Sequence, residues 1–283
     1  MDGASSPEAY RIRNARIPIL LALRPVTELN AHEETVPEDM ERLVSILSRD
    51  PVLRHPIIVD KETGLVLDGT HRLAALTRVG CKFAPCALVD YNNPKIRVER
   101  WFRLIMGSRL KEFSSRLNGM RAERSDALAG EKCLAERQCF ASLQDNQSCL
   151  TFRSTDPDPV RQALRAFEIE KIARNKGLNI TYTDTKTLSP GTAEFIMSTI
   201  QLEKHEVVQS SLKHTLFPPK TTRHIIPSRP LGINTPIEWL REDEPRRAQT
   251  KFIQHLTSKK MTRLPEGSVV GSRRYQEEVF IFE

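Results

Sequence analysis

The sequence predicts a mixed α/β (α+β) fold in two modest domains, and three observations support this prediction. Apolar residues 56–60 and 65–67 flank the turn-forming segment 61–64, as in a β-hairpin. A second pair of apolar segments surrounds Asp145-Asn146, and a helical pattern follows over residues 158–175. At 283 residues and 39% hydrophobic content, the chain can bury a core in each of two domains.

The first half of the chain alternates strand and helix patterns. We expect the polar residues 1–15 to be loose and the apolar residues 17–23 to form a core strand, because they are too few to span a bilayer. Residues 35–38 match a capping box with a proline in the first helical turn, which predicts an amphipathic helix ending near Arg49. A helix ending at Gly80 and a strand at 87–91 should follow the hairpin.

The second half of the chain combines a charge-rich segment with further strand and helix patterns. Gly107-Ser108 interrupts the pattern and suggests a domain boundary, and the charge-rich residues 109–136 suggest a surface-lying helix. Strands are expected at 178–182 and 195–200, and a short helix at 206–213. The resulting division is a loose N-terminus (1–15), a first domain (16–107), a second α/β domain (108–240) and a C-terminal extension (241–283).

Composition and absent motifs narrow the function classes. The net charge of +7 suits a protein that handles either nucleotides or nucleic acid. Five cysteines without a Cys-x-x-Cys pair favour neither a zinc site nor a disulfide framework, so a reducing cytoplasm is the expected compartment. The sequence contains no Walker-type phosphate loop, no Gly-x-Gly-x-x-Gly fingerprint and no His-Glu-x-x-His zinc helix.

The segment Asp68-Gly69-Thr70-His71-Arg72, called here the 68–72 turn, joins a predicted strand to a predicted helix. We expect Asp68 near the N-cap and the first backbone N–H groups to point along the positive end of the helix dipole, which favours an anion. His71 and Arg72 would add donors, and Gly69 would let a ligand approach the backbone. An ordinary strand-to-helix turn with Asp68 as a cap fits the local sequence equally well.

A second candidate anion site follows the double proline 218–219. Lys220, Thr221, Thr222, Arg223 and His224, the 220–224 loop, combine cations, hydroxyls and an imidazole. A solvated basic loop is the alternative interpretation. Two separate anion-binding segments could hold two parts of one reaction, which favours the functional interpretation.

Three more residues are candidates for chemistry. Glu33, just before a helix start, could act as a general base, although it or Glu34 could simply be a helix N-terminal acid. Asp68 could contact Mg²⁺ or serve only as a cap. Trp101 could line a substrate pocket or fill the core.

Taken together, His32-Glu33-Glu34, the 68–72 turn and the 220–224 loop resemble the archaeal free L-serine kinases of the ParB/sulfiredoxin-like superfamily. The resemblance implies a ParB/sulfiredoxin-like nucleotide-phosphate-binding domain over 16–107, and a domain over 108–240 that carries the substrate loop. It implies transfer of a phosphoryl group from ADP or ATP, with Mg²⁺, to free L-serine, giving O-phosphoserine in amino-acid metabolism. Neither a membrane nor nucleic acid is an expected partner.

The same resemblance suggests site residues. It assigns the base to Glu33, the essential acid near Mg²⁺ to Asp68, and the phosphate cradle to Gly69, His71 and Arg72. Thr70 stands where the family is expected to carry a second histidine, so the nucleotide donor stays open. Serine binding is implied for the following residues: Trp101, Lys220, Thr221, Thr222, Arg223 and His224.

The sequence does not favour two other functional classes of the superfamily. A ParB-like, nucleotide-dependent DNA-binding protein would need a Gly-Glu-Arg-Arg-type turn and a following helix-turn-helix domain, neither of which is evident. A sulfiredoxin-type reductase needs a cysteine in the turn, where Thr70 cannot supply a thiolate.

Overall fold

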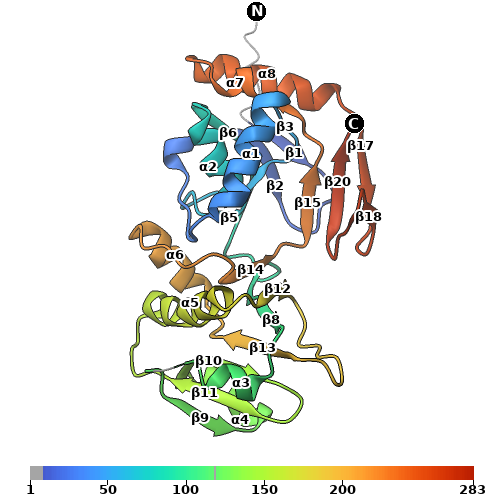
Figure 1. Cartoon of the computed structure of the whole chain (residues 1–283). Helices are drawn as coiled ribbons and strands as arrows, with labels where there is room; N and C mark the ends of the chain where they lie inside the picture. Colours follow the sequence, from blue (N-terminus) through green and yellow to red (C-terminus); the bar gives the residue numbers. More distant parts are fainter. Residues whose placement is uncertain (1–8, 118) are drawn as a thin grey trace, which may run out of the picture. The chain divides into compact units, whose positions relative to one another are not determined.

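The computed structural model describes residues 9–117 and 119–283, which divide into two compact units (Figure 1). Unit 1 holds the described residues up to Arg97 together with 211–214 and 224–283, and unit 2 holds 98–210 and 215–223. Strands and helices alternate in both, so the predicted mixed α/β class is confirmed.

Unit 1 is built on a five-stranded sheet in the order β1-β2-β6-β4-β5. Strands β4 and β6 are parallel, and the other neighbouring pairs are antiparallel. Helices α1 and α2 pack against each other, and α2 also contacts β4 (Figure 1). The elements are β1 (Tyr10–Ile12), β2 (Ile19–Pro25), α1 (Pro37–Arg49), β3 (Val52–Leu53), β4 (Ile57–Asp60), β5 (Val66–Asp68), α2 (Thr70–Arg78) and β6 (Phe83–Val89).

The hairpin and the parallel pairing place the start of α2 at the sheet edge. Strand β5 pairs with β4 on one side, and on the other the N–H of Val66 donates to the Asn30 carbonyl at 2.9 Å. Helix α2 returns the chain so that β6 can pair with β4 in parallel. Fully buried apolar side chains in β4 and β6, such as Ile57 and Ala87, supply the core that fixes this register. The 68–72 turn therefore leaves the free end of an edge strand.

The C-terminal part of the chain completes unit 1. Strands β15, β20 and β17 form a sheet in that order, and α8 packs on β1 and β2. A short strand, β16, pairs with β3. The elements are β15 (Ser228–Leu231), β16 (Thr235–Pro236), α7 (Ile237–Leu240), α8 (Pro245–Ser258), β17 (Met261–Leu264), β18 (Val269–Val270), β19 (Arg273–Arg274) and β20 (Glu278–Phe282).

Unit 2 contains a six-stranded antiparallel sheet in the order β12-β8-β13-β10-β11-β9. Helices α4 and α5 pack on it around a core that includes Phe113, Phe140 and Phe195 (Figure 1). The elements are β8 (Phe102–Met106), α3 (Leu110–Ser114), β9 (Ala122–Ser125), α4 (Ala127–Ala135), β10 (Cys139–Gln144), β11 (Cys149–Arg153), α5 (Pro159–Asn175), β12 (Asn179–Thr183) and β13 (Glu194–Thr199).

The remaining elements contain the points where the chain passes between units. The passages after Arg97, Ser210 and Arg223 fall within β7, α6 and β14, and a fourth passage, after His214, follows α6. These elements span Arg97–Arg100, Lys204–Leu212 and Thr222–Ile225, respectively.

The division differs from the expected one at both ends. The first passage comes after Arg97 instead of near residue 107, because β8 pairs with β12 and β13. Residues 241–283 form part of unit 1 instead of an extension, since α8 packs on its sheet. Strand β1 also forms inside the segment expected to be loose, and residues 1–8 lie outside the described part of the chain.

Two local predictions were wrong. The N-cap of α1 is Val36, which makes no side-chain cap, so the expected capping box does not form, although Pro37 opens the helix as predicted. Residues 109–136 form α3, β9 and α4 instead of one surface helix, because Phe113 and Leu117 are buried in the core of unit 2.

Within residues 9–117 and 119–283, no helix combines the length and the apolar character needed to cross a membrane.

Gly64 closes the hairpin turn and should be intolerant of any side chain. Its φ is +70°, and an added Cβ would lie 2.2 Å from the Glu28 carbonyl oxygen. Gly80 has a similar φ of +76°, with nothing within 4 Å of an added Cβ. Urea denaturation should show that Gly80→Ala costs about 1 kcal/mol, the cost of the left-handed backbone alone. Gly64→Ala should cost clearly more, and equal losses would contradict the role given to the close approach.

Candidate functional site

The 68–72 turn is an open helix N-terminus. Asp68 ends β5, Gly69 is the N-cap of α2 with φ +108°, and the Leu73 N–H donates to the Gly69 carbonyl at 2.9 Å. The backbone N–H groups that precede Leu73 therefore have no partner inside the helix. Together with the helix dipole, they form the kind of site that accepts a phosphate or carboxylate.

Gly69 and Arg72 fit together closely. A Cβ at Gly69 would lie 2.9 Å from Nε of Arg72, so only glycine leaves room for this guanidinium. Arg72 donates to Oδ2 of Asp68 at 3.0 Å, to the Pro56 carbonyl, and to the His55 carbonyl at 3.3 Å. These contacts brace the turn, and the direct contact of Arg72 with phosphate oxygens stays a prediction.

Asp68 lies next to the N-cap, as expected, but the alternative in which its side chain caps α2 does not hold, because two arginines bind its carboxylate. Arg229 from β15 donates to Oδ2, the same oxygen that Arg72 binds, and is itself held by Glu277 through a 2.6 Å bond from its Nε. Among the described residues, no hydrogen bond reaches the other oxygen, Oδ1. The carboxylate is thus anchored through one oxygen, and the second is available to a ligand.

The arginines also determine the charge of Asp68. Burial alone would raise the pKa of this carboxyl, but the Arg229 and Arg72 guanidiniums outweigh burial and hold its pKa well below its usual range. Sequence reasoning missed Arg229 and Glu277, which lie far from the turn along the chain and carry no local motif. The parallel pairing of β15 with β20 brings Glu277, which directly precedes β20, next to Arg229.

His71 links the starts of the two helices of unit 1. Its Nε2 accepts a 2.9 Å hydrogen bond from the N–H of Val36, the N-cap of α1. The acceptor role assigns the neutral ring, with its proton on Nδ1. This contact orients α1, and with it the chain that leads back to Glu33.

Glu33 lies beside a buried imidazole. His32 is 3% exposed, its Nδ1 bonds the Val66 carbonyl at 2.9 Å, and its Nε2 lies 3.8 Å from Oε1 of Glu33. Burial lowers the pKa of His32, against the opposing effect of Glu33, so the ring is neutral. The His224 ring packs edge-on against His32, at a centroid distance of 5.2 Å, and its Nε2 bonds the Tyr91 hydroxyl at 2.8 Å.

The described residues would hold Mg²⁺ only together with ligands from outside the protein, such as phosphate oxygens and water. They contain no group of three or more His, Cys, Asp or Glu side chains able to hold a metal ion. Mg²⁺ is commonly held by one or two carboxylates together with substrate phosphates and water. Oδ1 of Asp68 offers one such carboxylate oxygen beside the open amides of α2.

The first four residues of the 220–224 loop lie in unit 2, whereas His224 lies in unit 1. Lys220 adopts a left-handed backbone with φ +62°. Thr221 and Thr222 are buried, and the Thr221 hydroxyl donates to the Pro218 carbonyl at 2.8 Å. The Thr221 hydroxyl therefore stabilises the loop itself.

Arg223 is held against Trp101. Its guanidinium lies 5.3 Å from the centre of the indole ring and pairs with Glu99 at 3.0 Å and with Asp184 at 3.1 Å. Trp101 is half-buried, so it does not simply fill the core. Arg223 and Trp101 thus form one fixed surface next to the loop.

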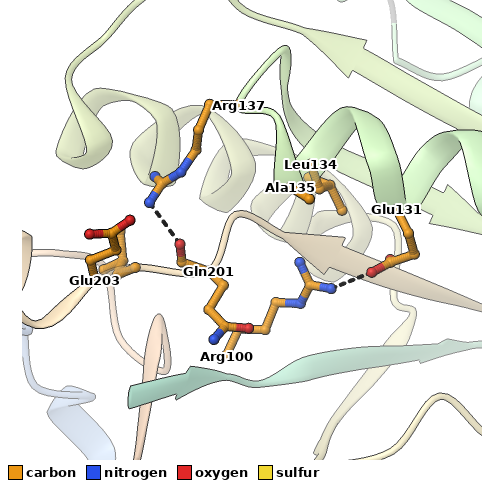
Figure 2. Close-up of a pocket in the computed structure, with 8 residues that line it drawn as sticks. Arg100, Glu131, Leu134, Ala135, Arg137, Gln201 and Glu203 are labelled. Atoms are coloured by element: carbon orange, nitrogen blue, oxygen red, sulfur yellow. Dashed lines mark hydrogen bonds and ion pairs between the residues drawn. The ribbon is translucent and has the colours of Figure 1, made fainter. Parts of the chain in front are cut away.

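A separate pocket of about 360 Å³ in unit 2 is a weaker candidate (Figure 2). Arg100 binds Glu131 at 2.6 Å, and Arg137 binds the Gln201 carbonyl at 2.8 Å (Figure 2). Because these guanidiniums already bind protein oxygens, the pocket presents little unsatisfied charge to a ligand.

The environment of Asp68 predicts a pH-dependent stability. A carboxyl with a lowered folded-state pKa adds stability above its unfolded pKa, about 4, and this stability is lost as pH falls toward the folded value. The free energy of unfolding of Asp68→Asn should therefore be lower than that of the wild type at pH 7, and the gap should narrow below pH 4.

The control is Asp39→Asn on the exposed side of α1. Its effect on the free energy of unfolding should vary little over the same pH range. A gap for Asp68→Asn that is constant from pH 7 to pH 2 would contradict the ion-pair assignment.

Comparison with known proteins identifies similar chains. No family model matches. An ATP-dependent L-serine kinase of Staphylothermus marinus is 27% identical over 76% of this chain and 89% of its own length. An ADP-dependent L-serine kinase of Thermococcus kodakarensis is 24% identical over 75% and 90%, and a ParB-like protein of Sulfolobus acidocaldarius is 28% identical over 70% and 86%.

Solved structures agree with the sequence matches. A glutamate-to-alanine variant of a free serine kinase in complex with ADP superposes with a TM-score of 0.69 at 20% identity, over 78% of this chain and 93% of that one. The resemblance inferred from the three motifs is thereby confirmed. The chain has the fold of the free serine kinases and is similar in sequence to archaeal L-serine kinases over about three quarters of its length.

Proposed function

We propose that this protein is a free L-serine kinase, which transfers the terminal phosphoryl group of ADP or ATP to the serine hydroxyl. The products are O-phosphoserine and AMP or ADP. The similar proteins named ATP- or ADP-dependent L-serine kinases support both the reaction and the choice of donors. The ParB-like alternative, nucleotide-dependent DNA binding, is not favoured, because the free serine kinases match in both sequence and fold.

The observation that carries the proposal is the N-terminus of α2 beside Asp68. Backbone N–H groups and a helix dipole suit nucleotide phosphates, and Arg72 and Arg229 hold the Asp68 carboxylate beside them. We assign the phosphate cradle to Gly69, Thr70, His71 and Arg72, with Arg72 acting mainly as a brace for Asp68. Thr70, at the first position of α2, is the residue in the cradle whose side chain differs from the expected family pattern.

We assign the general base to Glu33. In the proposed step the serine oxygen attacks the terminal phosphorus, the bond to the bridging oxygen breaks, and the hydroxyl proton passes to the Glu33 carboxylate. The neutral His32 beside it adds no positive charge that would weaken the base. Asp68 would hold Mg²⁺ through Oδ1. Bound Mg²⁺ would neutralise charge on the phosphates.

Serine binding is assigned to Trp101 and the 220–224 loop. Free serine carries a carboxylate, which a guanidinium or ammonium group binds well. The pairing of Arg223 with Glu99, Asp184 and Trp101 supports a rigid recognition surface, since each contact limits its motion. Lys220, Thr222 and His224 complete the set, and Thr221 keeps the loop in shape. We also retain the cytoplasm as the proposed compartment, which suits five cysteines that all remain free thiols.

The direct test is an assay of purified protein with serine, Mg²⁺ and either ADP or ATP. We expect O-phosphoserine by mass spectrometry with at least one donor, and the ratio of the two rates identifies the preferred nucleotide. Absence of O-phosphoserine with both donors would refute the proposal.

Glu33→Gln should lower kcat by about 100- to 10,000-fold, the usual contribution of a general base, while the nucleotide Kd stays near the wild-type value. Glu34→Gln is the matched control, because Glu34 is the adjacent, exposed carboxylate. Its kcat should remain close to that of the wild type. If Glu34→Gln were the inactive variant, the base would have to be reassigned.

Asp68→Asn should keep the shape of the carboxylate and lose its charge, so turnover should fall by orders of magnitude. Its nucleotide affinity should also depend less on Mg²⁺, which calorimetric titration with and without the metal would measure. An unchanged Mg²⁺ dependence would remove Asp68 from the metal site and leave it only the role of organising the turn.

A further inference from the structure

Unit 2 contains a deeply buried ion pair that no motif revealed. Arg103 of β8 is 2% exposed and Glu170 of α5 is 0% exposed, and Nε of Arg103 donates to Oε1 of Glu170 at 2.6 Å. Tyr182 of β12 donates to the other oxygen of Glu170 at 2.8 Å. Both carboxylate oxygens are therefore bound, as a buried charge requires.

The guanidinium of Arg103 also reaches the region assigned to serine. Nη1 donates to the Trp101 carbonyl at 2.7 Å, and Nη2 donates to the Lys220 carbonyl at 3.1 Å. A further bond, of 3.3 Å, runs from Nη1 to the Thr199 hydroxyl. One side chain thus binds the backbone of two residues from the proposed substrate surface.

Arg103 binds the 220–224 loop at a residue with a strained backbone. Lys220 is held at φ +62°, a conformation that costs a residue with a Cβ about 1 kcal/mol or more. A hydrogen bond to its carbonyl from a buried, charged donor helps to offset that cost. The register of the sheet pairs Arg103 with Tyr182 on one side and with Met197 on the other, so the backbone of Arg103 is held rigidly.

Arginine suits this role for a geometric reason. Its planar fork directs N–H groups from three separate nitrogens to a carboxylate and to two carbonyls, whereas the three donors of an ammonium group share one nitrogen and do not match that spread. A buried ion pair is seldom a net source of stability, since well-packed apolar residues commonly replace one without loss. The stability of the fold alone is therefore a poor explanation for an Arg103–Glu170 ion pair in contact with the loop.

We propose that Arg103, balanced by Glu170, is a positioning residue that holds Trp101 and Lys220 in the geometry needed to bind the amino-acid substrate. The inference rests on the proposed serine kinase function. Arg103 acts through the two backbone carbonyls, so its loss should weaken serine binding far more than nucleotide binding.

The test replaces both charges together, in Arg103→Met/Glu170→Met, so that no uncompensated charge remains buried. The double variant should unfold cooperatively in urea, like the wild type. Its KM for serine should rise at least tenfold, and its KM for the nucleotide should stay within twofold of the wild-type value. A folded double variant with an unchanged serine KM would overturn the proposal and leave the pair a purely structural role.

Arg103→Lys keeps the positive charge next to Glu170 and gives a second measurement if the double variant does not fold. It should also raise the KM for serine, because the three donors of an ammonium group share one nitrogen and do not match the spread of the guanidinium fork that reaches both carbonyls. An unchanged serine KM in this variant would count against the proposal as well.

The control is Arg137→Met. Arg137 also lies in unit 2 and binds a carbonyl and a carboxylate, those of Gln201 and Glu206, and within the described residues its side chain makes no hydrogen bond to the 220–224 loop. Its serine KM should match that of the wild type. The activity of the wild type distinguishes failure of the kinase proposal from failure of the proposal for Arg103. An inactive wild type refutes the kinase function, whereas an active wild type with an unaffected double variant refutes only the role of Arg103.

Discussion

The carboxylate of Asp68, held through one oxygen by Arg72 and Arg229, is the interaction on which the organisation of unit 1 depends. It ties the end of β5 to the first turn of α2 and to β15, a strand from the C-terminal part of the chain. Glycine at position 69 is required because the Arg72 guanidinium occupies the space of a side chain. The same pairings keep Asp68 ionised and engage only one of its two oxygens, so a structural contact is compatible with the charged ligand that we propose for this site.

Unit 2 uses buried charge in a related way. Arg103 of β8 and Glu170 of α5 neutralise each other, and other donors of Arg103 bind the backbone carbonyls of Trp101 and Lys220. Contacts of this kind position Trp101 and Lys220 through their backbone carbonyls and not through their side chains. In both units, an arginine that was not part of any motif fixes residues that were, which suggests that rigid support matters as much as the motif residues themselves.

Prediction from sequence succeeded where the signal is local. The hairpin at residues 57–68, the helix that follows it, and α5 were all expected from periodicity and turn residues. It failed where long-range packing decides. Asp68 looked like a cap, yet the arginines engage its carboxylate and Gly69 takes the cap position. Residues 109–136 looked like a surface helix, yet Phe113 and Leu117 enter a core whose other members lie far along the chain.

The sequence by itself determined the fold class and the resemblance to the free serine kinases, because the motifs around Glu33, Asp68 and Lys220 are short runs whose chemistry can be recognised locally. Only the tertiary structure decided what holds those motifs in place. Arg229 and Glu277 come from the C-terminal part of unit 1, and Glu170 comes from a helix distant in sequence from Arg103. The physical reason is that a buried charge must be satisfied by whichever partner the fold brings near, and sequence spacing carries no record of that partner.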